Sequence, residues 1–132
     1  MNDHGIYYWK DLESQIVYIG STGLPLERVE YNHRNARQLW PNESLSRFRR
    51  QLEDNPLWTI DWLVKRFPCE TRKIELAEQV AIQRFRPLCN KDLTPYQTSI
   101  WRGRYQGYDQ KEYVDLLQRI TYYIDKVEEE LE

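Results

Sequence analysis

Two tripeptides near the N-terminus, Gly-Ile-Tyr at positions 5–7 and Tyr-Ile-Gly at positions 18–20, constrain the fold more than any other part of the sequence. Each lies in a run of β-branched and aromatic residues, a composition that favours strands. The polar segment between the runs, residues 10–14, is short enough for a hairpin connection. The sequence therefore predicts a β-hairpin that carries two phenols, Tyr7 and Tyr18, toward one region of the fold.

Length and composition predict one folded domain. The chain has 132 residues, of which 40% are hydrophobic and 14% aromatic, a composition typical of globular proteins and not of disordered ones. The net charge of −2 excludes a uniformly basic nucleic-acid binder. Residues 109–132 hold three basic and eight acidic residues, a balance of −5, which leaves +3 for residues 1–108. Any nucleic-acid surface is therefore expected to be local and to lie in residues 1–108.

The two cysteines, Cys69 and Cys89, indicate a reduced cytoplasmic protein and not a disulfide scaffold, because no secretory signal pattern precedes them. They are too few for a zinc site, and the two histidines show no ligand spacing relative to them. No apolar run approaches transmembrane length, so we expect a soluble chain with no membrane partner.

A helix is predicted over residues 25–38, since Pro25 suits the first turn of a helix. At about 100° per residue, one side of this helix collects the packing positions Leu26, Val29, His33 and Ala36. The opposite side collects Arg28, Tyr31, Asn32 and Asn35. Arg28 is either a solvated helix arginine or, because it follows Tyr18 by ten positions, a functional one.

The next two elements are predicted to be a helix and a strand. Asn42 suits the cap of a helix that ends before Pro56. A narrow apolar stripe of this helix is made of Leu45, Phe48 and Leu52, and its other sides carry Arg47, Arg49 and Arg50. That basic run is either a solvated face or a patch that contacts phosphates. Residues 58–65 then alternate, with Trp58, Ile60, Trp62 and Val64 on one face, as expected for the third strand of an antiparallel sheet.

A carboxylate interrupts the apolar stripe of the following helix, predicted over residues 70–86 and ended by Pro87. Glu78 lies in the middle of the stripe formed by Ile74, Ala81, Ile82 and Phe85, with Glu75 near its edge. Burying a carboxylate there costs free energy unless a positive partner or a metal receives it. A metal site and a structural ion pair with an arginine both remain open.

The C-terminal third divides into a loop and a helix. Residues 91–109 have no clear period, and their segment Trp101-Arg102-Gly103-Arg104-Tyr105 either stacks on bases and contacts phosphates or pins the last helix to the core. The last helix has a heptad seam, made of Tyr113, Leu117, Ile120, Ile124, Val127 and Leu131. It is expected to pack on the domain, with a homodimer through this helix as the alternative. Its acidic outer face would repel DNA.

Several of these features occur together, in order, in one nuclease family. After the two tripeptides, Arg28 stands ten residues beyond Tyr18, and Glu78 is followed by Pro87 nine residues on and by Asn90 twelve residues on. Over about residues 4–91 this layout resembles the GIY-YIG nuclease family, and in particular the catalytic domains of its homing-type and excision-repair-type members. Residues 92–132 show no such likeness, so we expect a nuclease-like domain over 1–91, followed by the loop and the C-terminal helix.

The resemblance implies an α+β fold, with a small three-stranded antiparallel sheet flanked by helices, and metal-dependent hydrolysis of a phosphodiester. Glu78 would then be the one protein ligand of Mg²⁺ or Mn²⁺, ions that accept oxygen ligands and retain waters. Tyr7 is similar to the tyrosine that acts as general base or orients the attacking water. Tyr18 would hydrogen-bond the phosphate or the water, Arg28 would neutralise charge on the phosphate, and Asn90 would hold the site together.

Two positions depart from the family pattern. Many members have a histidine or tyrosine four residues after the arginine, where this chain has Asn32. We expect Tyr31, on the same helical side as Arg28, to supply that hydroxyl in preference to His33, which projects toward the apolar side. The second departure is Ser21, where the repair enzyme has lysine; homing-type members tolerate serine.

The function expected from the sequence is a metal-dependent endonuclease that cuts or nicks DNA, with RNA left open as the substrate. Nucleic-acid contacts are assigned to Arg47, Arg50, Trp101, Arg102 and Arg104. The alternative is a nucleic-acid-binding or regulatory module that kept the fold and lost the chemistry. A protein-interaction role of the acidic C-terminal helix is compatible with either.

Overall fold

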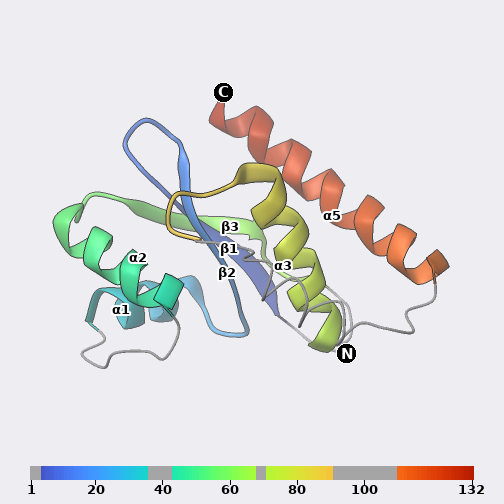
Figure 1. The fold of residues 1–132 in the computed structure, drawn as a ribbon, viewed down its shortest axis with the longest axis horizontal. Coiled ribbons are helices and arrows are strands. Elements are labelled where there is room, and N and C mark those ends of the chain that lie inside the picture. The colour runs from blue at the N-terminus through green and yellow to red at the C-terminus, as the bar shows by residue number, and fades with distance from the viewer. Residues whose placement is uncertain (1–3, 36–42, 68–70, 91–109) are drawn as a thin grey trace.

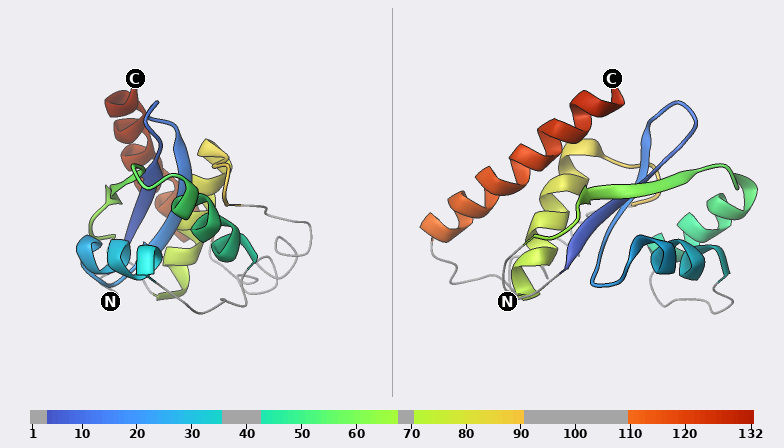
Figure 2. Two further views of the ribbon diagram at one scale, coloured as in Figure 1. Left: turned by 90° about the vertical axis from the view of Figure 1, so that its left-hand side faces the viewer. Right: turned by 180° about the vertical axis from the view of Figure 1, so that it is seen from behind.

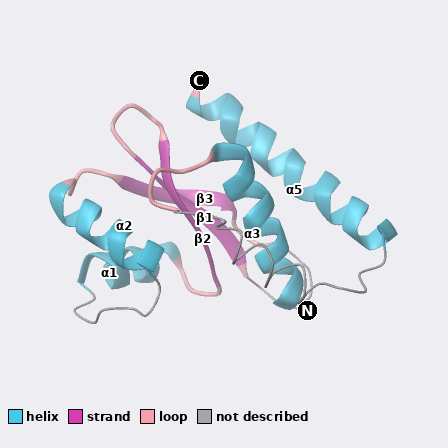
Figure 3. Cartoon of the chain, in the orientation of Figure 1, coloured by secondary structure: helices cyan, strands magenta, loops and turns pink. Residues whose placement is uncertain are grey.

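A computed structural model of the chain describes residues 4–35, 43–67, 71–90 and 110–132. The fold is α+β, as predicted: a three-stranded antiparallel sheet with strand order β2-β1-β3 is flanked by helices (Figures 1 and 3). The elements in chain order are β1 (Gly5–Lys10), β2 (Ile16–Thr22), α1 (Leu26–Asn35), α2 (Glu43–Asp54), β3 (Thr59–Val64), α3 (Thr71–Phe85) and α5 (Gln110–Leu131).

The predicted hairpin is confirmed, and β1 is the central strand of the sheet. Its register pairs Tyr7 with Gly20 and Trp9 with Tyr18. The connecting turn is closed by the Asp11 carboxylate, which accepts the backbone N–H groups of Glu13 and Gln15 at 2.9 Å each. β2 extends beyond the second tripeptide through Thr22, because its last residues still pair with the start of β1.

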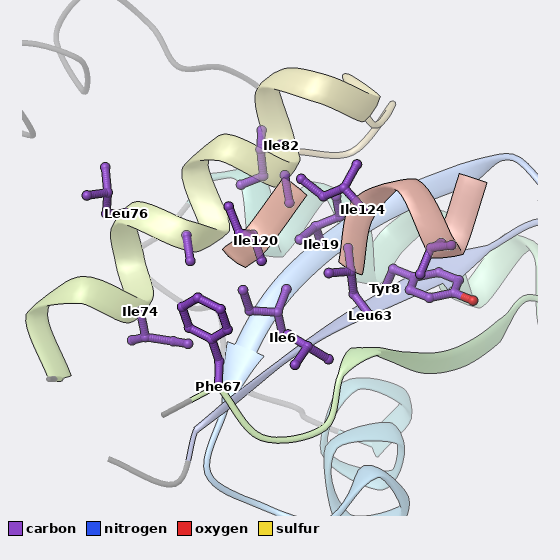
Figure 4. Packing of buried hydrophobic residues seen from close by; sticks show 14 of the residues in the cluster. Ile6, Tyr8, Ile19, Leu63, Phe67, Ile74, Leu76, Ile82, Ile120 and Ile124 are labelled. Atoms are coloured by element: carbon purple, nitrogen blue, oxygen red, sulfur yellow. The ribbon is translucent and has the colours of Figure 1, made fainter. Parts of the chain in front are cut away.

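One face of the sheet is aliphatic and is covered by α3 and α5. Ile6, Tyr8, Ile19 and Leu63 project from the strands into a cluster completed by helix residues, among them Ile74, Leu76, Ile82, Ile120 and Ile124 (Figure 4). α5 lies alongside α3 and also contacts β3 (Figure 1). Burial of these side chains is the dominant stabilising contribution on this face.

The middle of the heptad seam of α5 is buried inside the same chain, whereas Leu117 and Leu131 are half-buried. Ile120, Ile124 and Val127 are at most 3% exposed. The helix therefore packs on the domain, and a homodimer through α5, which stays a prediction, would use its outward face, where Val114 and Tyr122 are exposed. Among the described helices, none combines the length with the apolar character that crossing a membrane requires.

The other face of the sheet is aromatic and is covered by α1 and α2. Its cluster combines Tyr7, Trp9 and Trp58 with two helix residues, Val29 of α1 and Phe48 of α2. Seen from behind in Figure 2, the sheet runs between the α1–α2 pair and the α3–α5 pair. The predicted packing side of α1 and apolar stripe of α2 are thus the sides that meet the strands.

The prediction for the third strand is right in position and partly wrong in facing. Ile60 and Trp62 lie on the aromatic face as expected, but Val64 packs in the aliphatic cluster together with Leu63. The register between β1 and β3 shifts at Ile6 and Tyr7, and such a bulge interrupts strict alternation.

Candidate active site

A cleft of about 290 Å³ opens where β1, β2, α1 and α3 meet. Its lining includes Tyr7, Tyr18, Ser21, Asn32, His33 and Glu78. Three residues assigned from the sequence, Tyr7, Tyr18 and Glu78, are therefore brought together. They reach the cleft from three elements, because β1 and β2 carry the two phenols and α3 packs across β2.

A steric constraint explains why each tripeptide has a glycine. The Tyr7 ring lies across Gly20, so closely that a Cβ added there would sit less than 3.0 Å from ring atoms of Tyr7. A Cβ at Gly5 would meet the Lys65 carbonyl oxygen and the Trp62 ring within the same limit. Only glycine at position 20 leaves room for Tyr7 to reach the cleft. The glycine of the second tripeptide is therefore required by the tyrosine of the first.

His33 is the direct partner of Tyr7. The Tyr7 hydroxyl and Nε2 of His33 form a hydrogen bond of 2.9 Å. The imidazole is surrounded by rings, with the centroids of Tyr7, Trp9, Tyr18 and Phe48 at 5.2 to 5.9 Å. Val29 on the preceding turn of α1 is buried in the same face, so helical periodicity itself carries His33 to the two tyrosines.

Burial sets the protonation states of this group. Desolvation, with a smaller effect of the Arg49 charge, lowers the pKa of His33 from its usual 6.5 to about 4. Burial raises the pKa of Tyr7 well above 10, helped by Tyr18 and Glu78, and burial and Glu78 raise the pKa of Tyr18 as well. At neutral pH both phenols are therefore protonated and the imidazole is neutral.

Tyr18 is held from two sides. Its ring stacks on Phe48 of α2, with centroids 4.3 Å apart and planes at 16°. On the other side, the Asn90 side chain pairs with the backbone of the next strand residue: it accepts the Ile19 N–H at 2.5 Å and donates to the Ile19 carbonyl at 2.8 Å. The Cys89 N–H donates to Val17 at 2.9 Å, which extends this pairing along the outer edge of β2.

Glu78 avoids the burial that its helical position suggests. Ala77, Ala81 and Ile82 around it are buried, whereas Glu78 itself stays partly exposed, because it faces the cleft. The Ser21 hydroxyl donates a hydrogen bond of 3.1 Å to its Oε2. The side chain of Glu75 lies outside the described part of the structure.

Arg28 and Tyr31 lie on the exposed side of α1, as the helical period predicts. Arg28 is not among the residues that line the cleft, but it lies one helical turn before Asn32, which does. Tyr31 is 64% exposed and does not line the cleft. The residue of α1 that meets the Tyr7 hydroxyl is thus His33, from the packing side of the helix, and a role for Tyr31 in the site stays a prediction.

The predicted nucleic-acid contacts are only partly described. Arg50 is exposed on α2, while Arg49 is half-buried, with Nε 3.4 Å from the His33 carbonyl oxygen. The side chain of Arg47, and all of Trp101, Arg102 and Arg104, lie outside the described residues. Within the described ranges, no three His, Cys, Asp or Glu residues gather as a metal-ligand group.

Three residues around the site have no role assigned from the sequence: His33 and Ser21, which line the cleft, and Phe48, which stacks on Tyr18. His33 and Phe48 were predicted to be packing residues, and the packing sides of α1 and α2 are the sides that meet the two tyrosines. The helical periods of α1 and α2 therefore already indicate which residues of these helices meet the two tyrosines. Ser21 had no comparable pattern, because its partner Glu78 is 57 positions away in the sequence.

Comparison of the chain with protein-family models, with curated proteins and with solved structures gives no match. The resemblance to the GIY-YIG family therefore stays a prediction from the motif residues of the sequence.

Proposed function

We propose that this protein is a metal-dependent endonuclease of the GIY-YIG type, which hydrolyses or nicks DNA phosphodiester bonds. The observation that carries the proposal is the meeting of Tyr7, Tyr18 and Glu78 in one open cleft. A chance match of short motifs would not be expected to converge in space. A cytoplasmic location, and RNA as an alternative substrate, are part of the proposal on sequence grounds alone.

The donor set of the cleft suits a hard divalent cation. One carboxylate, Glu78, lies in the same cleft as the oxygen donors Tyr7 and Ser21, while the imidazole of His33, which also lines the cleft, is hydrogen-bonded to Tyr7. Mg²⁺ and Mn²⁺ accept oxygen ligands, and Mg²⁺ usually keeps several waters, for which an open cleft has room. Glu78 would hold the ion. When bound, the ion would supply positive charge against the phosphate oxygens.

Tyr7 and His33 together form a route for the proton of the attacking water. A buried phenol of raised pKa does not ionise by itself at neutral pH, so Tyr7 can accept a proton only as it releases its own. His33 Nε2, at 2.9 Å, is neutral and can accept that proton, provided that the imidazole carries its hydrogen on Nδ1. The negative charge of bound DNA would stabilise the resulting imidazolium. General acid–base catalysis of this kind typically contributes about 10²- to 10⁴-fold in rate.

Arg28 and Tyr18 would act on the phosphate. Arg28 is always charged, and guanidinium groups bind phosphate oxygens through paired hydrogen bonds. The stack of Tyr18 on Phe48 and the edge pairing by Asn90 fix the second phenol before the substrate arrives. Preorganised donors of this type stabilise charge as it develops in the transition state.

Plasmid cleavage tests the proposal. Purified protein is incubated with supercoiled plasmid and Mg²⁺ or Mn²⁺, next to Glu78→Gln and the matched control Glu129→Gln, which makes the same change at an exposed position of α5. Wild type and Glu129→Gln should nick equally. Glu78→Gln should lose about 10³-fold or more, since it removes the charge that holds the cation. No cutting by the wild type with either metal, or equal cutting by Glu78→Gln, would overturn the proposal.

The runner-up is an inactive nucleic-acid-binding module on the same fold, favoured by Asn32 in the cleft, where many family members have a titratable side chain. It predicts salt-sensitive DNA binding that Glu78→Gln leaves unchanged, with no cleaved product. The position of His33 favours the enzyme instead, because it supplies the titratable group from the neighbouring position.

A further inference from the structure

At the end of β2, successive residues point in turn toward the two halves of the cleft. Gly20 makes room for the Tyr7 ring, and the next residue, Ser21, lies on the same side of the strand as Ile19, toward α3. There its hydroxyl is 3.1 Å from Oε2 of Glu78. A carboxylate can only accept hydrogen bonds, so Ser21 is the donor.

We propose that Ser21 is a positioning residue that orients the Glu78 carboxylate for a divalent cation. The inference rests on the proposed function and deepens it. Resemblance gives Ser21 no such role, since the position was noted only as a departure from the lysine of the repair enzyme. The hydroxyl restricts the rotation of the carboxylate and makes its two oxygens inequivalent.

A hydroxyl is suited to this task because it is neutral. It donates one hydrogen bond to the carboxylate and adds no positive charge beside it. Ser21 holds the group and leaves its charge intact. Hydrogen bonds from outside the ligand shell typically fix ligand orientation in this way, and their loss weakens metal affinity by about 10- to 100-fold.

Ser21 is itself held on a rigid element. It pairs with Ile6 in the β1–β2 register, next to Tyr7, and the strand is fixed two residues earlier by the Asn90 side chain on Ile19. The Ser21–Glu78 bond therefore joins the hairpin that carries both phenols to the helix that carries the carboxylate. A site on such supports keeps its geometry better than one on loops.

The test measures metal binding directly, apart from cleavage. Mn²⁺ affinity is determined by electron paramagnetic resonance of the free ion for wild type, Ser21→Ala, Ser21→Cys and Ser21→Thr. Thr59→Ala is the matched control, because it removes a hydroxyl from an exposed strand position away from the cleft. Thermal unfolding of each variant shows that it is folded, and Ser21→Cys keeps the side-chain volume if alanine disturbs the strand.

Ser21→Ala should bind Mn²⁺ about 10-fold more weakly, with a matching rise in the Mg²⁺ concentration for half-maximal nicking. Ser21→Thr keeps the hydroxyl on a β-branched side chain that suits a strand, so it should stay within about 3-fold of wild type. Ser21→Cys, a weak donor, should fall between them. Affinity of folded Ser21→Ala or Ser21→Cys equal to that of wild type would overturn the inference, as would equal loss in alanine and threonine variants.

The two proposals fail separately. A wild-type protein that binds Mn²⁺ but cuts no DNA overturns the proposed function, while the affinity ratios still decide the role of Ser21. A protein that cuts DNA with unchanged metal affinity in Ser21→Ala overturns only the role of Ser21. Absence of Mn²⁺ binding by the wild type overturns both.

Discussion

The two faces of the sheet are built from different chemistry. The face under α3 and α5 is almost wholly aliphatic, and its contacts have no direction. The face under α1 and α2 is made of rings that carry hydroxyl and imidazole groups, each of which requires a partner at a defined angle. Alternation along a single strand serves both, since β1 sends Ile6 and Tyr8 to the first face and Tyr7 and Trp9 to the second.

The difference teaches which residues give stability and which give a site. A directionless aliphatic cluster supports the sheet and tolerates exchange of one apolar group for another of similar volume. The aromatic cluster also buries its side chains, and in addition it fixes the two phenols and keeps them protonated. Substitutions on the two faces should therefore separate activity from stability.

The largest effect is expected at Tyr7. Replacing Tyr7 with Phe removes one oxygen, so nicking should fall by about 10²- to 10⁴-fold because the proton route through His33 is lost. The free energy of unfolding should fall by only about 1 kcal/mol, the usual value of one hydrogen bond. The control is Tyr8→Phe, the same change one position along β1 but on the aliphatic face; single-turnover nicking rates compare the two. Similar loss in both variants would contradict the division of roles.

Ile120 should show the reverse pattern. It is fully buried in the aliphatic cluster, so Ile120→Ala should lower the free energy of unfolding by about 2–5 kcal/mol in urea titrations. The nicking rate per folded molecule should stay that of wild type. Val114→Ala, on the exposed side of α5, should change stability by no more than about 0.5 kcal/mol. An active-site defect in folded Ile120→Ala would break the comparison.

The pH dependence of stability should reveal His33. The unfolded imidazole binds a proton with a pKa near 6.5 and the folded one only near 4, so the unfolded state takes up more protons between these values. As the pH falls through this window, wild type should lose stability relative to His33→Gln, by up to about 3 kcal/mol. Above pH 6.5 the two curves should run parallel. Urea unfolding at several pH values measures the difference, and identical slopes across the window would refute it.

The smallest effect is expected at Tyr31. Tyr31 lies on the exposed side of α1. Tyr31→Phe should therefore change neither the free energy of unfolding nor the activation free energy of nicking by more than about 0.5 kcal/mol. The same assays as for Tyr7→Phe apply. A loss comparable with that of Tyr7→Phe would restore Tyr31 to the site and remove the argument for His33.

Much of the fold was predictable, since local periodicity determined it. The hairpin, the third strand and the two sides of α1 follow from alternation and helical spacing, and the structure confirms them. Val64 was assigned to the wrong face because a bulge in the β1–β3 pairing is a property of two strands together. The alternation of residues along one strand therefore cannot predict this bulge.

The site was less predictable for the same physical reason. Tyr7, Tyr18 and Glu78 could be assigned from motifs, but their partners are set by tertiary contacts. The helical period places His33 on the packing side of α1, and a packing position does not by itself indicate a role in a site. In a domain this small, the buried side of α1 is also the wall of the cleft. His33 therefore packs against the sheet and at the same time serves as the hydrogen-bond partner of Tyr7.

The pairing of Asn90 with Ile19 has a consequence for when the site becomes complete. The two residues are 71 positions apart in the sequence, so β2 gains its edge partner only after nearly all of the sheet and its helices exist. Contacts of such long range form late, because loop closure precedes them. During synthesis, a ribosome-bound chain that ends before Asn90 has both phenols but lacks the side chain that pairs with the edge of β2, the strand of Tyr18. The proposed DNA-cutting activity would thus be withheld from unfinished chains.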